Sequence, residues 1–337
     1  MKLKTMITTL LACQLAHFSQ ASLGQDVQAE VLEYVERARQ LAGDDHAFVF
    51  GQLCAGPIEF SGASPVTGEV PRALPSTDPE RDWYAEPVQV FDDLFFLGQT
   101  GFSIWGLRTS EGIILVDSNF EYSVEAAAIE GLRKLGIDPA EIKYVIISHA
   151  HGDHSGGAGI LQQKYGVRVV MSEADWDLYE NTAREDVKAT RDIVATDGMK
   201  LTLGDHTVQT FLTPGHTHGT ISTLLPVHDN GEEHLAAVWG GTLFNFRDDP
   251  NDPRDLRLRD YARSAVYFQG VIAGAGVDVI LSNHTAYDGS TVKIPALNER
   301  QPGMPHPYVI GNDAVWRYVK VAEECALGAR IAEASEG

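Results

Sequence analysis

The chain has 337 residues, 44% hydrophobic and 22% charged, so it has enough apolar material for one large domain or two small ones. Its 47 acidic residues outnumber its 26 basic ones and give a net charge of −21, which repels phosphate backbones and anionic lipids. This charge argues against a nucleic-acid partner and against anionic membranes, and it is compatible with a small-molecule substrate.

The first 21 residues have the pattern of a secretory signal peptide. A basic start and a short apolar stretch (residues 6–12) precede Ser19 and Ala21, two small residues placed for cleavage after Ala21. This predicts a periplasmic or secreted protein. Two alternatives stay open: an amphipathic N-terminal helix, and lipid attachment at Cys13 as in a bacterial lipoprotein. We expect no membrane span, because every other apolar stretch is too short for one.

Removal of the signal peptide leaves two cysteines, Cys54 and Cys325. In an oxidising compartment an even pair suggests a disulfide, which would tie the N-terminal extension to the last helix. Two buried free thiols are the alternative, and the sequence does not decide between them.

Ahead of the main domain, residues 27–43 have the periodicity of one helix and end at a glycine. Residues 55–82 are rich in Pro, Gly and Ser and have no period, which indicates a long arm that leads into the core. We therefore predict a signal peptide over 1–21, an N-terminal helix and wrapped arm over 22–84, and the main domain over 85–337.

From Val88 onward, short apolar strands are broken by turns and then alternate with helices. We expect strands at 88–98, 102–109, 112–118, 144–148, 167–172, 208–213, 221–227, 236–241 and 278–284. We expect helices at 123–135, 156–166, 258–275 and 313–333. A hairpin-rich first half followed by this alternation predicts an α/β fold with two mixed sheets and helices outside them.

The sequence "SHAHGDHSGG" follows the buried strand 144–148 directly. His149 and His151 are two residues apart, so they point the same way as the chain leaves the strand. Imidazole nitrogens at such a strand end suit a zinc ion. A cluster of solvated polar residues is the alternative, but three imidazoles this close would repel one another if charged.

The same turn continues with Asp153 and His154. We expect Gly152 to let the backbone turn sharply, and Gly156 and Gly157 to permit close packing where the next helix begins. The result is four side chains of metal-ligand type that converge from one turn.

Further ligands should come from other strand ends, because one turn cannot complete two metal sites. His216 follows the strand 208–213, and His284 follows another buried strand. Each alone is typical of a polar loop residue, but their shared position at strand ends favours ligation. His218 is interpreted as a loop residue, with a supporting role at the site as the alternative. The histidines expected at the surface are His46, His206, His228, His234 and His306.

The pattern His-x-His-x-Asp-His resembles the fingerprint of the metallo-β-lactamase superfamily, and the resemblance runs from about Trp83 to the C-terminus. It implies a four-layer αββα sandwich with a dinuclear zinc site at one edge. Carried over by motif, the first zinc would be held by His149, His151 and His216, and the second by Asp153, His154 and His284.

Within that superfamily the chain is most similar to the third subclass of true metallo-β-lactamases. Glyoxalase-like hydrolases, lactonases and RNA-processing members usually carry a bridging aspartate where this chain has Gly241 and Thr242. Thr242 stands near a serine of the third subclass, which implies that it binds substrate. The departures are this threonine, Phe244 for a second serine and His218 for a proline, and they bear on substrate preference more than on the metal site.

The resemblance implies a secreted hydrolase with two Zn²⁺ ions, most of all a β-lactamase that opens the lactam ring with a metal-bound hydroxide. Asp153 would be the catalytic residue that positions this nucleophile. Another hydrolase of the same fold, a lactonase or thioesterase acting on a small ester or amide, is the alternative. A non-catalytic binding module and a nuclease are further alternatives, and the acidic charge argues against the nuclease. We expect a monomer that binds no nucleic acid.

Overall fold

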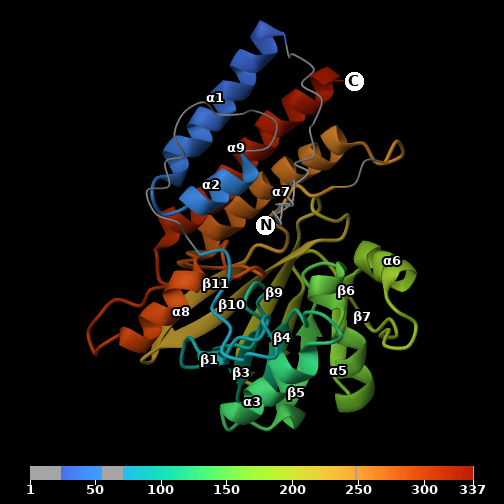
Figure 1. Cartoon of the computed structure of the whole chain (residues 1–337), viewed down its shortest axis with the longest axis vertical. Helices are drawn as coiled ribbons and strands as arrows, with labels where there is room; N and C mark the ends of the chain where they lie inside the picture. Colours follow the sequence, from blue (N-terminus) through green and yellow to red (C-terminus); the bar gives the residue numbers. More distant parts are fainter. Residues whose placement is uncertain (1–23, 55–70, 247–248, 337) are drawn as a thin grey trace, which may run out of the picture.

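The computed structural model of the protein describes residues 24–54, 71–246 and 249–336. Within them, two β-sheets lie between layers of helices (Figure 1). The predicted αββα sandwich is therefore confirmed. The predicted signal peptide and most of the predicted arm lie outside the described residues.

The first sheet has seven strands in the order β1-β2-β3-β4-β5-β6-β7. They are β1 (Val88–Gln89), β2 (Leu94–Phe96), β3 (Trp105–Thr109), β4 (Gly112–Val116), β5 (Ile142–Ile146), β6 (Arg168–Ser172) and β7 (Ile193–Ala195). Strands β1 to β4 are antiparallel neighbours, whereas β4 to β7 run parallel. Because parallel strands end at the same edge, the loops after β4, β5 and β6 meet there.

The second sheet has five strands in the order β12-β11-β10-β9-β8. They are β8 (Lys200–Leu203), β9 (His206–Leu212), β10 (Ile221–Asp229), β11 (Glu232–Val238) and β12 (Val279–Leu281). Strands β8 to β11 are antiparallel, and β12 runs parallel to β11.

Nine α-helices are described, and they surround the sheets. They are α1 (Gln25–Ala42), α2 (Ala47–Leu53), α3 (Glu130–Lys134), α4 (Gly152–Ser155), α5 (Ala158–Tyr165), α6 (Glu173–Thr182), α7 (Arg254–Ala275), α8 (Ser290–Glu299) and α9 (Asn312–Glu336). Among these described helices, none is long and apolar enough to cross a membrane.

Strand β4 has an uninterrupted apolar sequence because both of its faces are buried. Ile114 belongs to the core between the two sheets, whereas Ile113 and Leu115 belong to the core beneath α3, α5 and α6. Side chains that alternate between two buried faces make every position of such a strand apolar. A third core joins the second sheet to α7, α9 and α1, with Trp239 and Phe268 among its buried side chains.

Helix α1 lies alongside α9 in the outer helical layer (Figure 1). Val31 and Val35 of α1 are buried in the same core as Val319 of α9. A disulfide joins Cys54, directly after α2, to Cys325 on α9, so the disulfide alternative is the one that the structure contains. The N-terminal extension thus covers the helical layer, while a domain boundary near residue 84 stays a prediction.

Helices α2, α4, α6 and α8 and the edge strands β7 and β8 were not predicted from the sequence. The two strands have only three and four residues, too few for a period to show. Helix α8 contains Pro295, which sequence rules assign to a helix end. Helix α6 is mostly polar, and Ser172 caps it by accepting a hydrogen bond from the Asp175 N–H.

Candidate metal centre

The loop after β5 carries the first predicted ligands to the edge where parallel strands end. His149 and His154 are buried, with 1% and 0% of their surfaces exposed. Gly157 allows close packing, since a Cβ there would lie 2.5 Å from the Ser118 carbonyl oxygen. The expectation for Gly152 is wrong: it begins α4 with open space around it, so the turn needs no glycine at that position.

Three imidazoles from two loops meet at this edge. The Nε2 atom of His216, from the loop after β9, lies 3.0 Å from His149 Nε2 and 3.1 Å from His151 Nδ1. Nitrogen ligands of a tetrahedral zinc ion, each about 2.0–2.1 Å from the metal, lie about 3.3–3.4 Å apart. The spacing of these three nitrogens is close to that of a zinc site.

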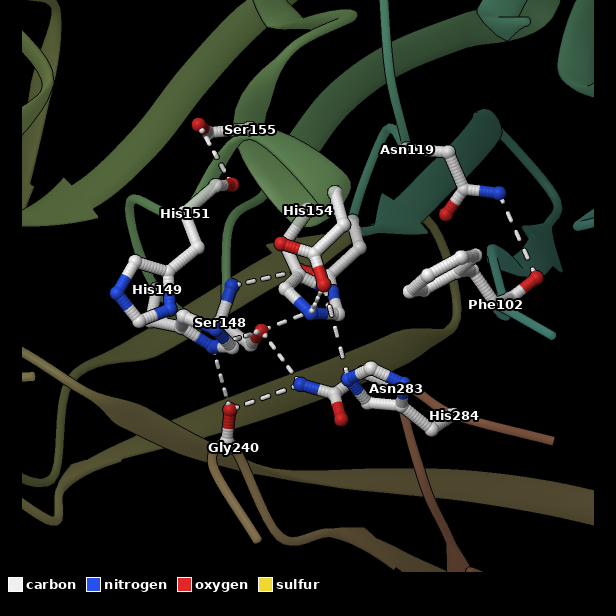
Figure 2. A network of polar contacts seen from close by, with 12 residues as sticks. Phe102, Asn119, Ser148, His149, His151, His154, Ser155, Gly240, Asn283 and His284 are labelled. Carbon is white, nitrogen blue, oxygen red and sulfur yellow. Dashed lines mark hydrogen bonds and ion pairs between the residues drawn. The ribbon is translucent and has the colours of Figure 1, made fainter. Parts of the chain in front are cut away.

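The protonation of two of these rings is fixed by backbone carbonyls. The Nδ1 atom of His149 donates to the Gly240 carbonyl at 2.8 Å (Figure 2), and Nδ1 of His216 donates to the Leu243 carbonyl at 2.7 Å. A carbonyl only accepts, so each neutral ring carries its proton on Nδ1 and a lone pair on Nε2.

Burial and the neighbouring imidazoles keep these two rings neutral. They lower the pKa of His149 well below its ordinary value and the pKa of His216 to about 3. The two Nε2 lone pairs therefore face each other 3.0 Å apart without a proton between them. Such an arrangement is repulsive unless a cation lies between the nitrogens, and this chemistry fits zinc.

A second group forms beside the first from Asp153, His154 and His284. The Oδ2 atom of Asp153 lies 3.1 Å from His154 Nε2 and 3.8 Å from His284 Nε2. His154 Nε2 is buried without a directed hydrogen bond to any described residue, and its approach to Asp153 is a charge contact only. Figure 2 shows His284 beside His154, at the end of β12.

The charges of this second group also call for a cation. Burial opposes protonation of His154, but the carboxylates of Asp153 and Asp117 outweigh it and raise the pKa of this imidazole to about 10. Burial likewise raises the pKa of Asp153, but His154 and His284 outweigh it and hold that pKa well below the ordinary value. Without a metal ion, a proton on His154 supplies the positive charge that the two carboxylates demand, and a metal ion at Nε2 would take its place.

Asp117, at the end of β4, is a supporting residue that the sequence analysis missed. Its Oδ2 accepts from His154 Nδ1 at 3.0 Å and from Ser148 Oγ at 2.9 Å, and its Oδ1 accepts from the Ser148 N–H at 2.7 Å. It is fully buried and adopts a left-handed φ of 66°. A carboxylate on the far nitrogen fixes which nitrogen of His154 faces the metal site.

Asn283 joins the ligand loops from the second sheet. Its Nδ2 donates to the Gly240 carbonyl at 2.9 Å and to Ser148 Oγ at 3.1 Å (Figure 2). The next residue is His284, so this amide links the loop after β12 to the ends of β5 and β11.

Asp175 performs the same task between the loops after β5 and β9. Its carboxylate accepts from the Ala150 N–H at 2.9 Å, from Thr217 Oγ1 at 2.9 Å and from the Gly219 N–H at 3.1 Å. Asp175 lies at the start of α6, a helix that the sequence analysis did not predict, so its position near the site could not be inferred.

Helix α7 holds the His216 loop from the other side. Arg257 Nη2 donates to the carbonyls of Gly215 and His216 at 2.7 and 2.6 Å, and Ser264 Oγ donates to the Pro214 carbonyl at 2.7 Å. Gly215 has a φ of 148°, and a Cβ there would lie 2.5 Å from Tyr261 Cα, so only glycine fits.

The remaining predicted residues fall in different places. Thr242 is buried with 2% exposed, and its carbonyl accepts from Tyr261 Oη at 2.9 Å, so its role in substrate binding stays a prediction. The His218 side chain is 60% exposed and pairs with Asp252 at 3.0 Å, outside the ligand groups.

The expected surface position of several other histidines is wrong. His46, His206 and His306 are buried, with 4%, 7% and 5% exposed. His46 Nε2 contacts the Ala314 carbonyl oxygen, and His306 contacts the Val90 carbonyl oxygen through Nε2 and accepts from the Tyr308 N–H at Nδ1, so both buried rings have hydrogen-bond partners. Their polar sequence neighbours gave no sign of these distant partners.

A family model described as the metallo-beta-lactamase superfamily matches residues 103–229. Among solved structures, the chain is similar to BJP-1, a subclass B3 metallo-beta-lactamase of Bradyrhizobium japonicum, with 26% identity and a TM-score of 0.62 over 72% of this chain and 94% of that one. It is also similar in fold to native FEZ-1 metallo-beta-lactamase from Legionella gormanii, with 21% identity and a TM-score of 0.61 over 79% and 99% of the two chains.

Two curated proteins are similar over shorter segments. A probable polyketide biosynthesis zinc-dependent hydrolase, BaeB of Bacillus velezensis, is 31% identical over 121 residues, which are 36% of this chain and 48% of that protein. An N-acyl homoserine lactonase of a Bacillus species is 28% identical over 169 residues, with 42% and 65% covered. The matches thus span about half to two thirds of these relatives. Residues 103–229 thus match the metallo-β-lactamase superfamily, and the fold of the chain is similar to that of the subclass B3 enzyme BJP-1.

Proposed function

We propose that the protein is a zinc-dependent hydrolase that opens the lactam ring of β-lactams. The observation that carries the hydrolase proposal is the convergence of three imidazoles. His216 Nε2 lies 3.0 Å from His149 Nε2 and 3.1 Å from His151 Nδ1. These three residues would hold one zinc ion, and Asp153, His154 and His284 would hold a second. Zinc bound there supplies a Lewis acid for the scissile carbonyl and lowers the pKa of a water ligand to about 7.

Asp153 is the residue that we assign to positioning the attacking water. Its neighbours keep it ionised, so its carboxylate would accept a hydrogen bond from this water and orient it. The side chain is 25% exposed, which leaves an oxygen accessible from the substrate side. His154 and His284 hold this carboxylate in place from two different loops.

An aromatic wall beside His284 would contact the substrate. The Phe102 ring lies 5.0 Å from the His284 ring, Phe120 packs edge-on against Phe102, and Tyr122 stacks on Phe120. Tyr122 is 56% exposed, so its outer face is available to an apolar substituent of a substrate. Thr242 is a weaker candidate for direct contact because only 2% of it is exposed.

The end of β11 favours a β-lactam over a lactone. Superfamily members with a bridging aspartate carry it near this point, but here a Cβ on Gly241 would lie 2.4 Å from His216 Cβ. This backbone therefore leaves no room for an acidic side chain at that position. The likeness to BJP-1, a subclass B3 enzyme, supports the same substrate class.

Export rests on two supports. The first is the signal-peptide pattern over residues 1–21, and the second is the disulfide between Cys54 and Cys325, because disulfides persist in oxidising compartments. We therefore propose a periplasmic or secreted enzyme.

Lactonase activity is the second candidate, because the N-acyl homoserine lactonase matches 42% of this chain. The test is turnover of nitrocefin, a penicillin, a cephalosporin, a carbapenem and an N-acyl homoserine lactone by zinc-loaded protein. We expect lactam hydrolysis that His151→Ala abolishes and His234→Ala, a substitution outside both ligand groups, preserves. Lactone hydrolysis alone supports the second candidate. Turnover of none of the five contradicts both.

A further inference from the structure

A second histidine–carboxylate cluster lies at the opposite end of the second sheet. It consists of Asp93, His206 and His228, whose ligand-type atoms all lie within 4.8 Å of one another. His206 begins β9, whereas His216 follows the other end of that strand. Seven residues of extended chain span about 20 Å, so this cluster is separate from the candidate metal centre.

Three elements from both sheets build the cluster. Asp93 lies in the turn between β1 and β2 of the first sheet, and His228 lies near the end of β10 in the second. Asp93 Oδ2 is 2.8 Å from His206 Nε2 and 2.6 Å from His228 Nδ1. The side chains of Asp93 and His206 are 13% and 8% exposed and that of His228 is 34% exposed, so the cluster is open to water only on the His228 side.

The groups around the cluster hold its atoms in place. Asp93 Oδ1 accepts from the His228 backbone N–H at 3.0 Å, which leaves Oδ2 to face the two imidazoles. Asp205 Oδ1 lies 2.9 Å from His206 Nδ1 and accepts from the Ser110 N–H at 2.8 Å. A carboxylate on the far ring nitrogen is the arrangement that orients metal-binding histidines.

His206 therefore has a carboxylate on each of its two nitrogens. When the neutral ring donates from Nδ1 to Asp205, its Nε2 lone pair points at an oxygen of Asp93. That contact is favourable only if a proton or a metal ion lies between the two atoms. Burial opposes protonation, but the hydrogen bonds to Asp93 and Asp205 outweigh it and raise the pKa of His206.

A surface hollow gives access to the cluster. Its lining includes Asp92 and Asp205 beside the three cluster residues, together with one guanidinium, that of Arg108. Arg108 is directed in part toward Glu141, at 3.3 Å. Three carboxylates against one partly neutralised guanidinium make the hollow attractive to a cation.

We propose that Asp93, His206 and His228 form a second binding site for a transition-metal ion of the Zn²⁺ class, which ties the β1–β2 turn to β9 and β10. Two imidazoles and one carboxylate are a ligand set that zinc accepts, with a fourth position left for water from the hollow. Zinc would displace the ring protons that otherwise join the three side chains. The site would fasten the two sheets together at the end far from the reaction.

The test counts zinc ions in protein equilibrated at fixed free zinc, at neutral pH, by elemental analysis. The starting protein carries His149→Ala and His216→Ala, which remove two ligands of the candidate metal centre. Adding His228→Gln tests the new site, and adding His234→Gln is the matched control, because His234 pairs with Asp278 outside the cluster. We expect His228→Gln to remove one zinc per chain and His234→Gln to remove none.

Equal zinc content with and without His228→Gln overturns the proposal and leaves the cluster as a hydrogen-bond network. Circular dichroism establishes that each variant is folded. If His228→Gln fails to fold, Asp93→Asn, which keeps the side-chain shape, decides by the same count. In protein with an intact candidate metal centre, neither His228→Gln nor Asp93→Asn should change the rate of hydrolysis. A zinc count that overturns this proposal therefore leaves the proposed function unaffected.

Discussion

Two clusters of imidazoles and carboxylates lie at opposite ends of the β-sandwich, and they differ in the hydrogen-bond partners of their imidazole rings. At the candidate metal centre, His149 and His216 donate Nδ1–H to backbone carbonyls, and their Nε2 lone pairs face each other. At the other end, His206 lies between two carboxylates, which stabilise a protonated ring.

The pKa directions follow from this difference. Burial and neighbouring imidazoles lower the pKa of His216 to about 3. At His206, by contrast, the carboxylates of Asp93 and Asp205 raise the pKa of the ring. A metal ion is thus required to relieve the contact between His149 and His216, while a proton suffices at His206. Clusters of similar residue types therefore differ in whether they need a metal ion. The difference depends on whether the ring nitrogen that faces away from the cluster contacts a backbone carbonyl or a carboxylate.

Among substitutions that compare the two clusters, His216→Ala is expected to have the largest effect on zinc content and hydrolysis. The substitution removes the nitrogen that contacts both His149 and His151, so we expect loss of zinc from the first group and of all hydrolysis above background. Elemental analysis and turnover of nitrocefin measure the two losses. Chelation of the unchanged protein should give the same inactive state, and added zinc should restore only the unchanged protein. Retained turnover in His216→Ala would contradict the ligand assignment.

Removing the disulfide should affect the fold without distinguishing the two clusters. The bond closes a loop of 271 residues, and loss of a native disulfide costs about 2–5 kcal/mol of unfolding free energy. The measurement is urea unfolding of the Cys54→Ser/Cys325→Ser double variant. Its hydrolysis at low temperature should stay unchanged, because Cys325 lies in the helical core. An unchanged unfolding midpoint would show that the packing of α1 on α9 is sufficient without the bond.

Asp117→Asn should weaken zinc binding by roughly 10–100-fold, the usual effect of removing the partner of a ligating histidine. Oδ2 of the carboxylate accepts from the His154 and Ser148 side chains and Oδ1 accepts from the Ser148 N–H, whereas an amide would set its NH2 group against one of these donors. Competition with a zinc chelator of known affinity measures the change. Hydrolysis separates the two ends of the molecule: it should fall in Asp117→Asn and stay unchanged in Asp93→Asn, which removes a ligand of the proposed second zinc site only. Equal effects of both substitutions on hydrolysis would remove the distinction between the clusters.

The smallest effect is expected at the aromatic wall. Tyr122→Ala removes one stacked ring worth about 0.5–1.5 kcal/mol, which corresponds to a roughly 2–10-fold rise in KM for a substrate with an aromatic substituent. The kcat should hold, because Tyr122 contacts neither ligand group. Tyr267→Ala, another exposed ring, on α7, is the control. A fall in kcat without a change in KM would place Tyr122 in catalysis rather than in substrate binding.

Much of the site could be predicted because its ligands directly follow apolar strands. His149, His216 and His284 each come after a strand whose pattern is visible in the sequence. These strands belong to two sheets, and β9 is antiparallel to its neighbours, so the packing of the two sheets brings the three ends to one edge. The alternation of strands and helices predicted two mixed sheets with helices outside them. The four-layer αββα order and the division of the ligands between two zinc ions came from the resemblance to the metallo-β-lactamase superfamily.

The supporting residues could not be predicted because their partners are distant in sequence. Asp117 and Asp175 resemble ordinary turn and helix-start residues until β4, β5 and α6 are placed side by side. The disulfide depended on the distance between Cys54 and Cys325, which spacing along the chain does not give. The burial of His206 likewise follows from Asp93, 113 residues away.

The most direct test of the central claim is anomalous X-ray scattering at the zinc edge from crystals grown with zinc. The account predicts one ion about 2.0–2.1 Å from His149 Nε2, His151 Nδ1 and His216 Nε2, and a second among Asp153, His154 and His284. An anomalous map without a peak between the three imidazoles, from protein that hydrolyses β-lactams, would contradict it.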